Sequence, residues 1–257
     1  MCNIKEFVGV LEKYAPLSLS KKMIEKGAYD NSGVIVHSSS MVKRVLFSLD
    51  LSNASVAEAE RLGCDTIVTH HPAIYTPIKD LDIDGETGAL LRAISLKMNV
   101  ISMHLNLDIA ERGIDQCLAE GLGGKDIKVL DYVTETNGYG REGDVKEVDA
   151  SEFLQAVKCA FGTDKAVLYG SGKVKKVASF CGSGASEALN AQTDADLIVT
   201  SDVQHHELKE LIERGKNVII LPHYVSEQYG FNKFYVRVKG LALSDVEVFY
   251  FIDKRFI

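Results

Sequence analysis

The sequence predicts an α/β fold made of two similar units, each a mostly parallel sheet flanked by helices. Three observations lead to this fold class. Short β-type runs alternate with helical patterns along the chain, which is typical of parallel strands joined by helices. The order of these runs in the first half recurs in the second half. Polar and histidine-bearing residues directly follow the predicted strands, where open α/β sheets place their ligand crevice.

The first half opens with an amphipathic helix, because apolar residues recur at helical spacing between Ile4 and Tyr14. Gly63 is expected to end a later helix, as glycine often does at a helix C-terminus. The remaining predicted elements are, in chain order, a turn, a strand, a helix, a strand, a helix and a strand: 30–33, 43–50, 54–62, 66–69, 89–98 and 100–103.

The second half repeats this order. Its strands and helices are expected, in chain order, at 176–180, 184–191, 195–200, 206–214 and 217–220. One such echo between β-rich stretches arises easily by chance, whereas an ordered series favours two related units.

The stretch 134–150 is polar and contains glycines, which is typical of a connection between units. We therefore predict a first unit at 1–133 and a second at 134–257. The C-terminal segment 245–252 has the pattern of a final strand. It completes either the first unit or the second, and the sequence leaves both open.

Composition excludes several classes of protein. The chain has 257 residues and a net charge of −7, which disfavours binding to nucleic-acid backbones. Five cysteines without CxxC spacing indicate reduced thiols rather than a disulfide network. The N-terminus lacks the pattern of a signal peptide, and no apolar run approaches the ~18 residues of a membrane helix. We expect a cytoplasmic protein with no membrane partner.

Six of the seven histidines lie at four predicted strand ends. The four ends carry His70-His71, then His104 with Asp108, then Ser201-Asp202 with His205-His206, and finally His223 with Glu227. In the second and fourth groups a carboxylate follows the histidine by four residues. Positions i and i+4 share a helix face, so each pair can bind one ion. His37 lies elsewhere and is expected to be an ordinary surface or strand residue.

Imidazole and carboxylate ligands without thiolate suit Zn, Mn, Fe, Co or Ni. Five or more such ligands exceed what one tetrahedral ion needs, so two divalent ions per chain are the natural interpretation. For any single pair, a capped helix or a satisfied polar residue explains the pattern as well. The four groups together favour a metal centre.

The chain resembles the NIF-three-like family, also called dinuclear metal-centre proteins or GTP cyclohydrolase I type 2 homologues. The matching segments run in family order: Tyr29-Asp-Asn-Ser-Gly33, Thr69-His-His-Pro72, His104-Leu-Asn-Leu-Asp108, Cys181-Gly-Ser-Gly-Ala185, Ser201-Asp202 with His205-His206, and His223-Tyr-Val-Ser-Glu227. The resemblance implies five metal ligands: His70, His71, Asp108, His223 and Glu227. It also implies a dimetal site in the cleft between the two units and a homohexameric ring.

These observations favour a metal-dependent hydrolase acting on a small substrate, a phosphoester or a nucleotide. His104 or His206 would move a proton to the leaving group, and Asp202 would orient His206 or a metal ligand. The sequence shows no guanine-reading motif that would support the cyclohydrolase name. The alternative is a metal-handling or regulatory scaffold without turnover.

The glycine turn at 182–184 has two interpretations. Backbone N–H groups at the start of the following helix can bind an anion, such as a substrate phosphate. Tight packing between strand and helix explains the same glycines.

Overall fold

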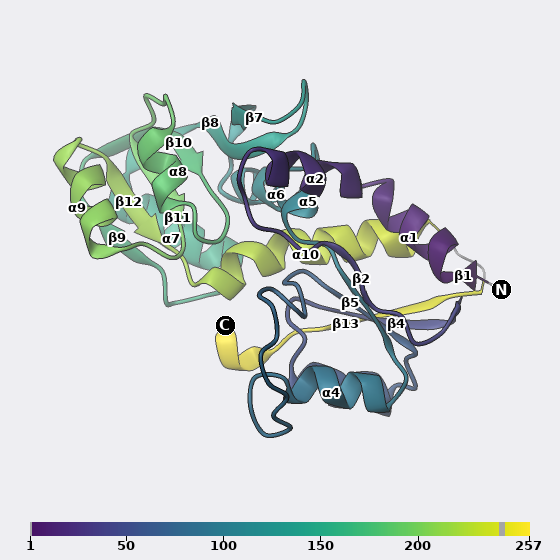
Figure 1. Cartoon of the computed structure of the whole chain (residues 1–257). Helices are drawn as coiled ribbons and strands as arrows, with labels where there is room; N and C mark the ends of the chain where they lie inside the picture. Colours follow the sequence, from purple (N-terminus) through teal and green to yellow (C-terminus); the bar gives the residue numbers. More distant parts are fainter. Residues whose placement is uncertain (1, 242–244) are drawn as a thin grey trace. The chain divides into compact units, whose positions relative to one another are not determined.

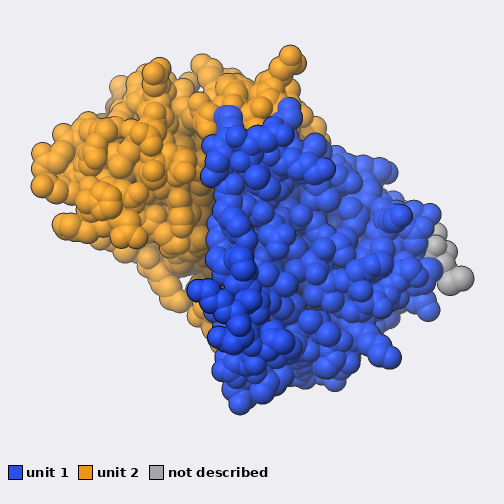
Figure 2. All heavy atoms as spheres, in the orientation of Figure 1, with its two compact units in different colours: residues 1–107, 232–253 blue, residues 108–231, 254–257 orange. Residues whose placement is uncertain are grey.

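The computed structural model describes residues 2–241 and 245–257. The chain folds as two compact units, which Figure 2 shows in different colours. Unit 1 comprises residues 1–107 and 232–253, and unit 2 comprises residues 108–231 and 254–257. Each unit contains one large mixed sheet with helices, as expected for an α/β protein. No helix among the described residues combines the length and apolarity needed to cross a bilayer.

The sheet of unit 1 has five strands in the order β13-β4-β5-β6-β2. Its strands are β13 (Glu247–Phe251), β4 (Arg44–Ser48), β5 (Thr66–Thr69), β6 (Asn99–Ser102) and β2 (Gly33–Val36). The first four are parallel to one another, and β2 is antiparallel to β6. The C-terminal strand therefore completes the first unit, because β13 pairs with β4. A separate two-stranded antiparallel sheet pairs β1 (Cys2–Asn3) with β3 (Met41–Val42).

Successive side chains along a strand point to opposite faces of the unit 1 sheet, and helices pack against both faces. On one face, α3 (Asn53–Arg61) and α4 (Gly88–Ser95) pack on Leu46, Ile67 and Val100. On the other, Phe47 contacts Phe234 of α10 (His223–Gly240). The remaining unit 1 helices are α1 (Ile4–Glu12), α2 (Leu17–Glu25) and most of the short α5 (Leu105–Asp108). Figure 1 shows α4 and α10 as labelled ribbons.

The sheet of unit 2 has six strands in the order β7-β8-β10-β11-β12-β9. They are β7 (Lys125–Tyr132), β8 (Gly138–Asp149), β10 (Lys173–Ser179), β11 (Leu197–Thr200), β12 (Asn217–Ile220) and β9 (Val167–Tyr169). The central strands β10, β11 and β12 are parallel, like β4, β5 and β6 of unit 1. In both units an antiparallel strand, β2 or β9, closes one side.

The helices of unit 2 are α6 (Ile114–Gly121), α7 (Ala150–Phe161), α8 (Ala185–Asn190), α9 (His205–Glu213), the first half of α10, and the C-terminal 3-10 turn Lys254–Phe256. Here α8 and α9 pack on Ala178, Ile198 and Val218, as α3 and α4 pack on the parallel strands of unit 1. The repeat expected from the sequence is therefore visible in both the strand order and the helix packing.

Two details differ from the sequence expectation. The stretch 134–150 is not a loop connection, because most of it forms β8, which pairs with β7 and β10. Its glycines reflect close packing: a Cβ on Gly140 would lie 2.4 Å from the Phe180 ring. The observed units also divide after residue 107 rather than 133, because β7 pairs with β8 in the second sheet.

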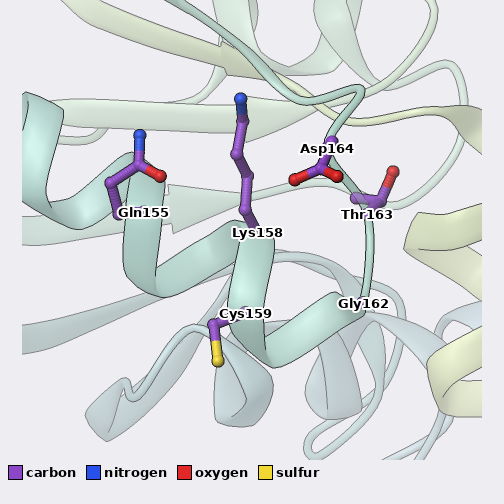
Figure 3. A pocket seen from close by; sticks show the side chains of 6 residues that line it. All are labelled: Gln155, Lys158, Cys159, Gly162, Thr163 and Asp164. Atoms are coloured by element: carbon purple, nitrogen blue, oxygen red, sulfur yellow. The ribbon is translucent and has the colours of Figure 1, made fainter.

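Helix α7 ends at Gly162, whose φ of +64° is typical of a left-handed helix cap. A surface pocket of 360 Å³ lies at this helix end (Figure 3). It is lined by Gln155, Lys158, Cys159, Gly162, Thr163 and Asp164. None of these residues is among the ligands or catalytic residues expected from the sequence.

Candidate metal centre

Three imidazoles lie at the carboxyl ends of neighbouring strands in unit 1. His70 and His71 follow β5, and His104 follows β6. The ring centroid of His70 lies 4.9 Å from that of His71 and 5.2 Å from that of His104, while His71 and His104 are 6.0 Å apart. His70 is fully buried, and His71 and His104 are partly buried. The parallel register of β5 and β6 brings the three rings together.

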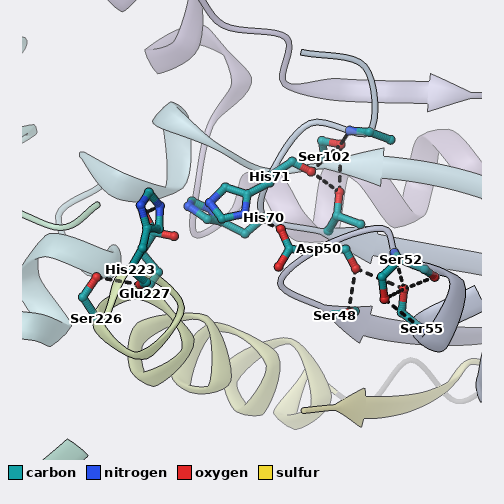
Figure 4. Close-up of polar contacts among 12 residues, drawn as sticks. Ser48, Asp50, Ser52, Ser55, His70, His71, Ser102, His223, Ser226 and Glu227 are labelled. Atoms are coloured by element: carbon teal, nitrogen blue, oxygen red, sulfur yellow. Dashed lines mark hydrogen bonds and ion pairs between the residues drawn. The ribbon is translucent and has the colours of Figure 1, made fainter. Parts of the chain in front are cut away.

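Each of these rings is oriented by an acceptor at Nδ1. His70 donates to the carbonyl oxygen of Met103 at 2.8 Å. His71 donates to Asp50 Oδ1 at 2.6 Å, a pair drawn in Figure 4. His104 donates to Asp30 Oδ1 at 2.7 Å. Since a carbonyl or a carboxylate accepts the proton on Nδ1, the lone pair lies on Nε2. This is the tautomer that metal-binding histidines adopt.

The hydrogen-bond partners of Asp30 favour the ionised form of its carboxylate. Its side chain is fully buried and accepts hydrogen bonds from His104, Ser20 and Ser32. Burial alone raises the pKa of Asp30, but these three hydrogen bonds outweigh it and hold the pKa below its usual range. A carboxylate that remains negative keeps the His104 ring in one orientation.

In unit 2, His223 and Glu227 lie one turn apart at the start of α10, as the spacing predicts. His223 donates from Nδ1 to Asp202 Oδ2 at 2.6 Å. Its Nε2 lies 3.1 Å from Glu227 Oε1, and Figure 4 shows His223 beside Glu227. With the Nδ1 proton engaged, the neutral ring and the ionised carboxylate both present lone pairs at that distance. A proton or a metal ion between them is required to offset the repulsion.

Asp202 accepts a hydrogen bond from His223, a predicted metal ligand. Its Oδ2 accepts from His223 and, at 2.8 Å, from Ser183 Oγ. Burial raises the pKa of Asp202, but the hydrogen bonds from His223 and Ser183 outweigh burial and hold the pKa below its usual range. His206, the second residue of α9, is exposed.

Three buried side chains of unit 2 form a group that can hold a metal ion. One oxygen from each of Asp108 and Glu227 and the Cys181 sulfur lie within 4.8 Å of one another. The Cys181 thiol donates to Asp108 Oδ1 at 3.4 Å. Burial raises the pKa of this thiol well above its usual value, and the nearby carboxylates add to the effect. Two buried carboxylates in one place are costly without a cation or a proton, so the group suits a positively charged ligand.

The backbone closes tightly over this group at Gly182. Its φ is +61°, and a Cβ there would lie 2.5 Å from Glu227 Oε1 and 3.4 Å from the His223 ring. Only glycine fits both the left-handed conformation and the contact. The packing interpretation of the glycine turn is also supported at Gly184, where a Cβ would lie 2.3 Å from Phe180 Cβ. The Gly184 N–H donates to Thr200 Oγ1, so it is not available to an anion.

Sequence reasoning missed the carboxylates that orient the histidines of unit 1. Asp50 is the second residue after β4, so the rule that identified the other strand ends would also have found it. Asp30 lies in a segment that was interpreted as a turn and matched to the family, but no role was assigned to its carboxylate. Cys181 was given no role at the site, yet its buried side chain contacts Asp108, a predicted ligand.

Comparison with known proteins identifies the family. The sequence profile described as Duf34/NIF3 (NGG1p interacting factor 3) matches residues 2–255. The chain belongs to the Duf34/NIF3 family. The resemblance inferred from the motifs is thus confirmed over nearly the whole chain.

Two relatives share the name "GTP cyclohydrolase 1 type 2 homolog". The protein of Clostridium perfringens is 28% identical over 253 residues, covering 95% of this chain and 94% of the relative. The protein of Methanocaldococcus jannaschii is 31% identical over 241 residues, covering 90% and 92%.

Solved structures share the fold. A Bacillus cereus protein related to NIF3 superposes with a TM-score of 0.86 at 20% identity, covering 98% of each chain. Reduced HcgD from Methanocaldococcus jannaschii has a TM-score of 0.79 at 27% identity, covering 97% of each chain. The arrangement of sheets and helices is therefore that of the NIF3 proteins.

Proposed function

We propose that the protein is a dinuclear, metal-dependent hydrolase of a small phosphoester or nucleotide. His70 and His71 of unit 1 and Asp108, His223 and Glu227 of unit 2 would bind the two divalent ions. The observation that carries this proposal is the pairing at His223. Its Nδ1 proton is engaged by Asp202, while its Nε2 faces Glu227 Oε1 at 3.1 Å. That arrangement suits two ligands of one cation.

The donor atoms of these residues fit the two proposed divalent metal ions. Imidazole Nε2 atoms with Nδ1 held by acceptors, together with buried carboxylates, form the nitrogen and oxygen set that Zn, Mn, Fe, Co and Ni accept. The nearby Cys181 sulfur adds a softer donor, which favours Zn, Fe or Co over Mn. When bound, divalent ions at such a site act as Lewis acids and activate water near neutral pH.

The side chains around the ligands have distinct tasks. Asp50, Asp30 and Asp202 keep the Nδ1 protons in place and fix the rings of His71, His104 and His223. His104 has the same tautomer as the proposed ligands, so its Nε2 can take up a proton, release one to a leaving group, or bind an ion. His206 at the exposed start of α9 is a second proton donor in the proposal.

The proposal is tested by elemental analysis of protein purified without chelators. We expect two ions per chain, with both lost or strongly weakened in His70→Ala, a unit 1 variant, and in Glu227→Gln, a unit 2 variant. His37→Ala changes an exposed histidine outside the proposed site and serves as the matched control. Protein that binds no ion, even after titration with Mn, Zn, Fe and Co, would contradict the proposal.

Catalysis is tested separately with a panel of phosphoesters and nucleotides, GTP included, using the loaded protein. Activity that His70→Ala abolishes supports the hydrolase. Bound ions that exchange readily, with no turnover on the panel, favour the metal-handling scaffold instead. His206→Ala should slow turnover and leave metal content unchanged. The homohexameric ring is a further part of the proposal, and light scattering of the purified protein tests it.

A further inference from the structure

Two exposed tyrosines of unit 1 form an aromatic wall. Tyr29 is 52% exposed and Tyr75 is 46% exposed, yet their rings contact each other edge to face, with centroids 5.1 Å apart at 78°. Both residues lie outside helices and strands, Tyr29 before β2 and Tyr75 after β5. Large aromatic side chains left half in water are available to a ligand.

The wall is held in place. Asn31 donates from Nδ2 to the carbonyl oxygen of Ile74 at 2.7 Å, which ties the two segments together next to the tyrosines. Asp30, directly after Tyr29, is fixed by its hydrogen bonds from His104 and Ser32. Since these contacts restrain the backbone on both sides, a ligand would bind with little ordering cost.

The wall continues into the histidine cluster. The Tyr75 ring meets the His104 ring edge to face, with centroids 5.9 Å apart at 87°. His104 in turn lies 5.2 Å from His70, a proposed metal ligand. Four neighbouring rings therefore connect the surface to the proposed metal ligands of unit 1: Tyr29, Tyr75, His104 and His70. A molecule seated on the tyrosines would have its neighbouring groups close to these histidines.

We propose that Tyr29 and Tyr75 bind the planar heteroaromatic ring of the substrate, such as a nucleobase, which stacks on one tyrosine and meets the edge of the other. This inference rests on the proposed function, because it assigns the substrate class of the same site. Every base has a π-face, so stacking on tyrosine tolerates different bases. The wall therefore predicts a substrate with a planar ring but little discrimination between bases. A protein partner is a poorer fit, because a stable interface needs about 800 Å² from each side and the wall is two side chains.

The chain offers a clean reporter because it contains no tryptophan. Tyr29→Trp and Tyr75→Trp each preserve an aromatic face and introduce a single tryptophan, whose fluorescence can be excited apart from that of the tyrosines. Metal-free protein is titrated with adenosine, uridine and ribose, which carry no phosphate to be repelled by the acidic groups. We expect saturable changes in fluorescence with both nucleosides, at affinities within a few-fold of each other, and none with ribose. Tyr132→Trp, at an exposed tyrosine of unit 2, is the matched control and should not respond.

Loss of either tyrosine ring should weaken adenosine binding. Tyr75→Leu in the Tyr29→Trp protein, and Tyr29→Leu in the Tyr75→Trp protein, should each reduce adenosine affinity about tenfold, as expected for one lost aromatic contact. Far-ultraviolet circular dichroism confirms that the variants fold. No saturable response in either reporter, or an equal response at position 132, would overturn the inference. A change in oligomeric mass with unchanged adenosine affinity would also overturn it, since the wall would then be a contact between copies.

The design separates this inference from the proposed function. Nucleoside binding to metal-free protein does not depend on the ions, so failure of the metal proposal leaves the titration unaffected. Conversely, a protein that binds two ions but shows no response to nucleosides keeps its metal centre and loses the aromatic wall.

Discussion

The carboxylate of Asp202 holds the imidazole of His223 by a 2.6 Å hydrogen bond at Nδ1. Asp202 lies just after β11 and His223 just after β12, so two adjacent parallel strands of unit 2 deliver the pair. The bond fixes both the tautomer and the direction of the His223 ring. A proposed metal ligand is thus oriented before any ion binds.

Replacing Asp202 should weaken metal binding without removing it. Asp202→Asn keeps a hydrogen-bond acceptor but loses the negative charge, so His223 becomes a poorer ligand. Partners of this kind change metal affinity 10- to 100-fold. Competition with a chromophoric chelator measures the change. Asp194→Asn, which removes a carboxylate paired with Lys176 on the surface, is the control and should leave the affinity within twofold. Equal affinities for the two variants would contradict the role assigned to Asp202.

Gly182→Ala should abolish metal binding because it displaces the side chain of Glu227, a proposed ligand. The new Cβ would lie 2.5 Å from Glu227 Oε1, so the carboxylate must move. The left-handed backbone adds a cost of about 1–2 kcal/mol to folding. Gly162→Ala imposes the same strain, with a φ of +64°, but has nothing within 4 Å of its Cβ. Urea unfolding should show similar losses of stability for both variants, and elemental analysis should show lost metal only for Gly182→Ala. Retained metal in Gly182→Ala would count against Glu227 as a ligand.

Asp115 should make stability fall as pH rises from about 4 to about 6. Complete burial raises the pKa of Asp115 to about 6, although Arg141 and the N–H groups of Cys181 and Gly140 oppose the shift. Between its ordinary pKa and 6, the native state holds a proton that the unfolded state has released. The free energy of unfolding therefore decreases over this range, by about 3 kcal/mol, and levels off above it.

The test compares pH profiles of unfolding for metal-free protein. Asp115→Asn should be less stable, because one of the two N–H groups loses its acceptor, and it should lack this decline. Asp164→Asn, at an exposed position, should keep the decline of the parent protein. Parallel profiles for Asp115→Asn and the parent would show that Asp115 titrates normally.

One thiol should react much faster than the others. All five cysteines are free, and Cys159 is exposed while Cys2, Cys64, Cys117 and Cys181 are buried. Burial also raises the pKa of the Cys64 thiol to about 11, so little thiolate exists at pH 8. Ellman's reagent should therefore titrate one fast thiol per native chain and five in denaturant. Cys159→Ser should remove the fast phase, and a persistent fast phase would mean that a buried cysteine is accessible.

The strands and helices of the repeat were predictable because their patterns are local. The run at 66–69 is a strand flanked by polar residues, and its histidines lie where the sequence predicts. The C-terminal strand was predictable as a strand but not in its pairing, because register is set by contacts distant in sequence. The segment 138–149 was missed for a related reason. Its polar residues and glycines suggest a loop, while its hydrogen bonds to β7 and β10 make it a strand.

The residues of the candidate site were predictable to a similar extent. Histidines and carboxylates at strand ends can be recognised from spacing. The partners that orient them cannot, because Asp30 and His104 are 74 residues apart and meet only in the folded unit. Asp115 contacts Cys181 across 66 residues for the same reason. Tyr29 and Tyr75 likewise form a wall only after folding.

Anomalous diffraction from crystals of cobalt-loaded protein tests the central claim most directly. The account predicts two anomalous peaks per chain, with His70, His71, Asp108, His223 and Glu227 as the protein ligands. Peaks confined to other residues, or no peak in protein shown to be loaded with cobalt, would contradict it.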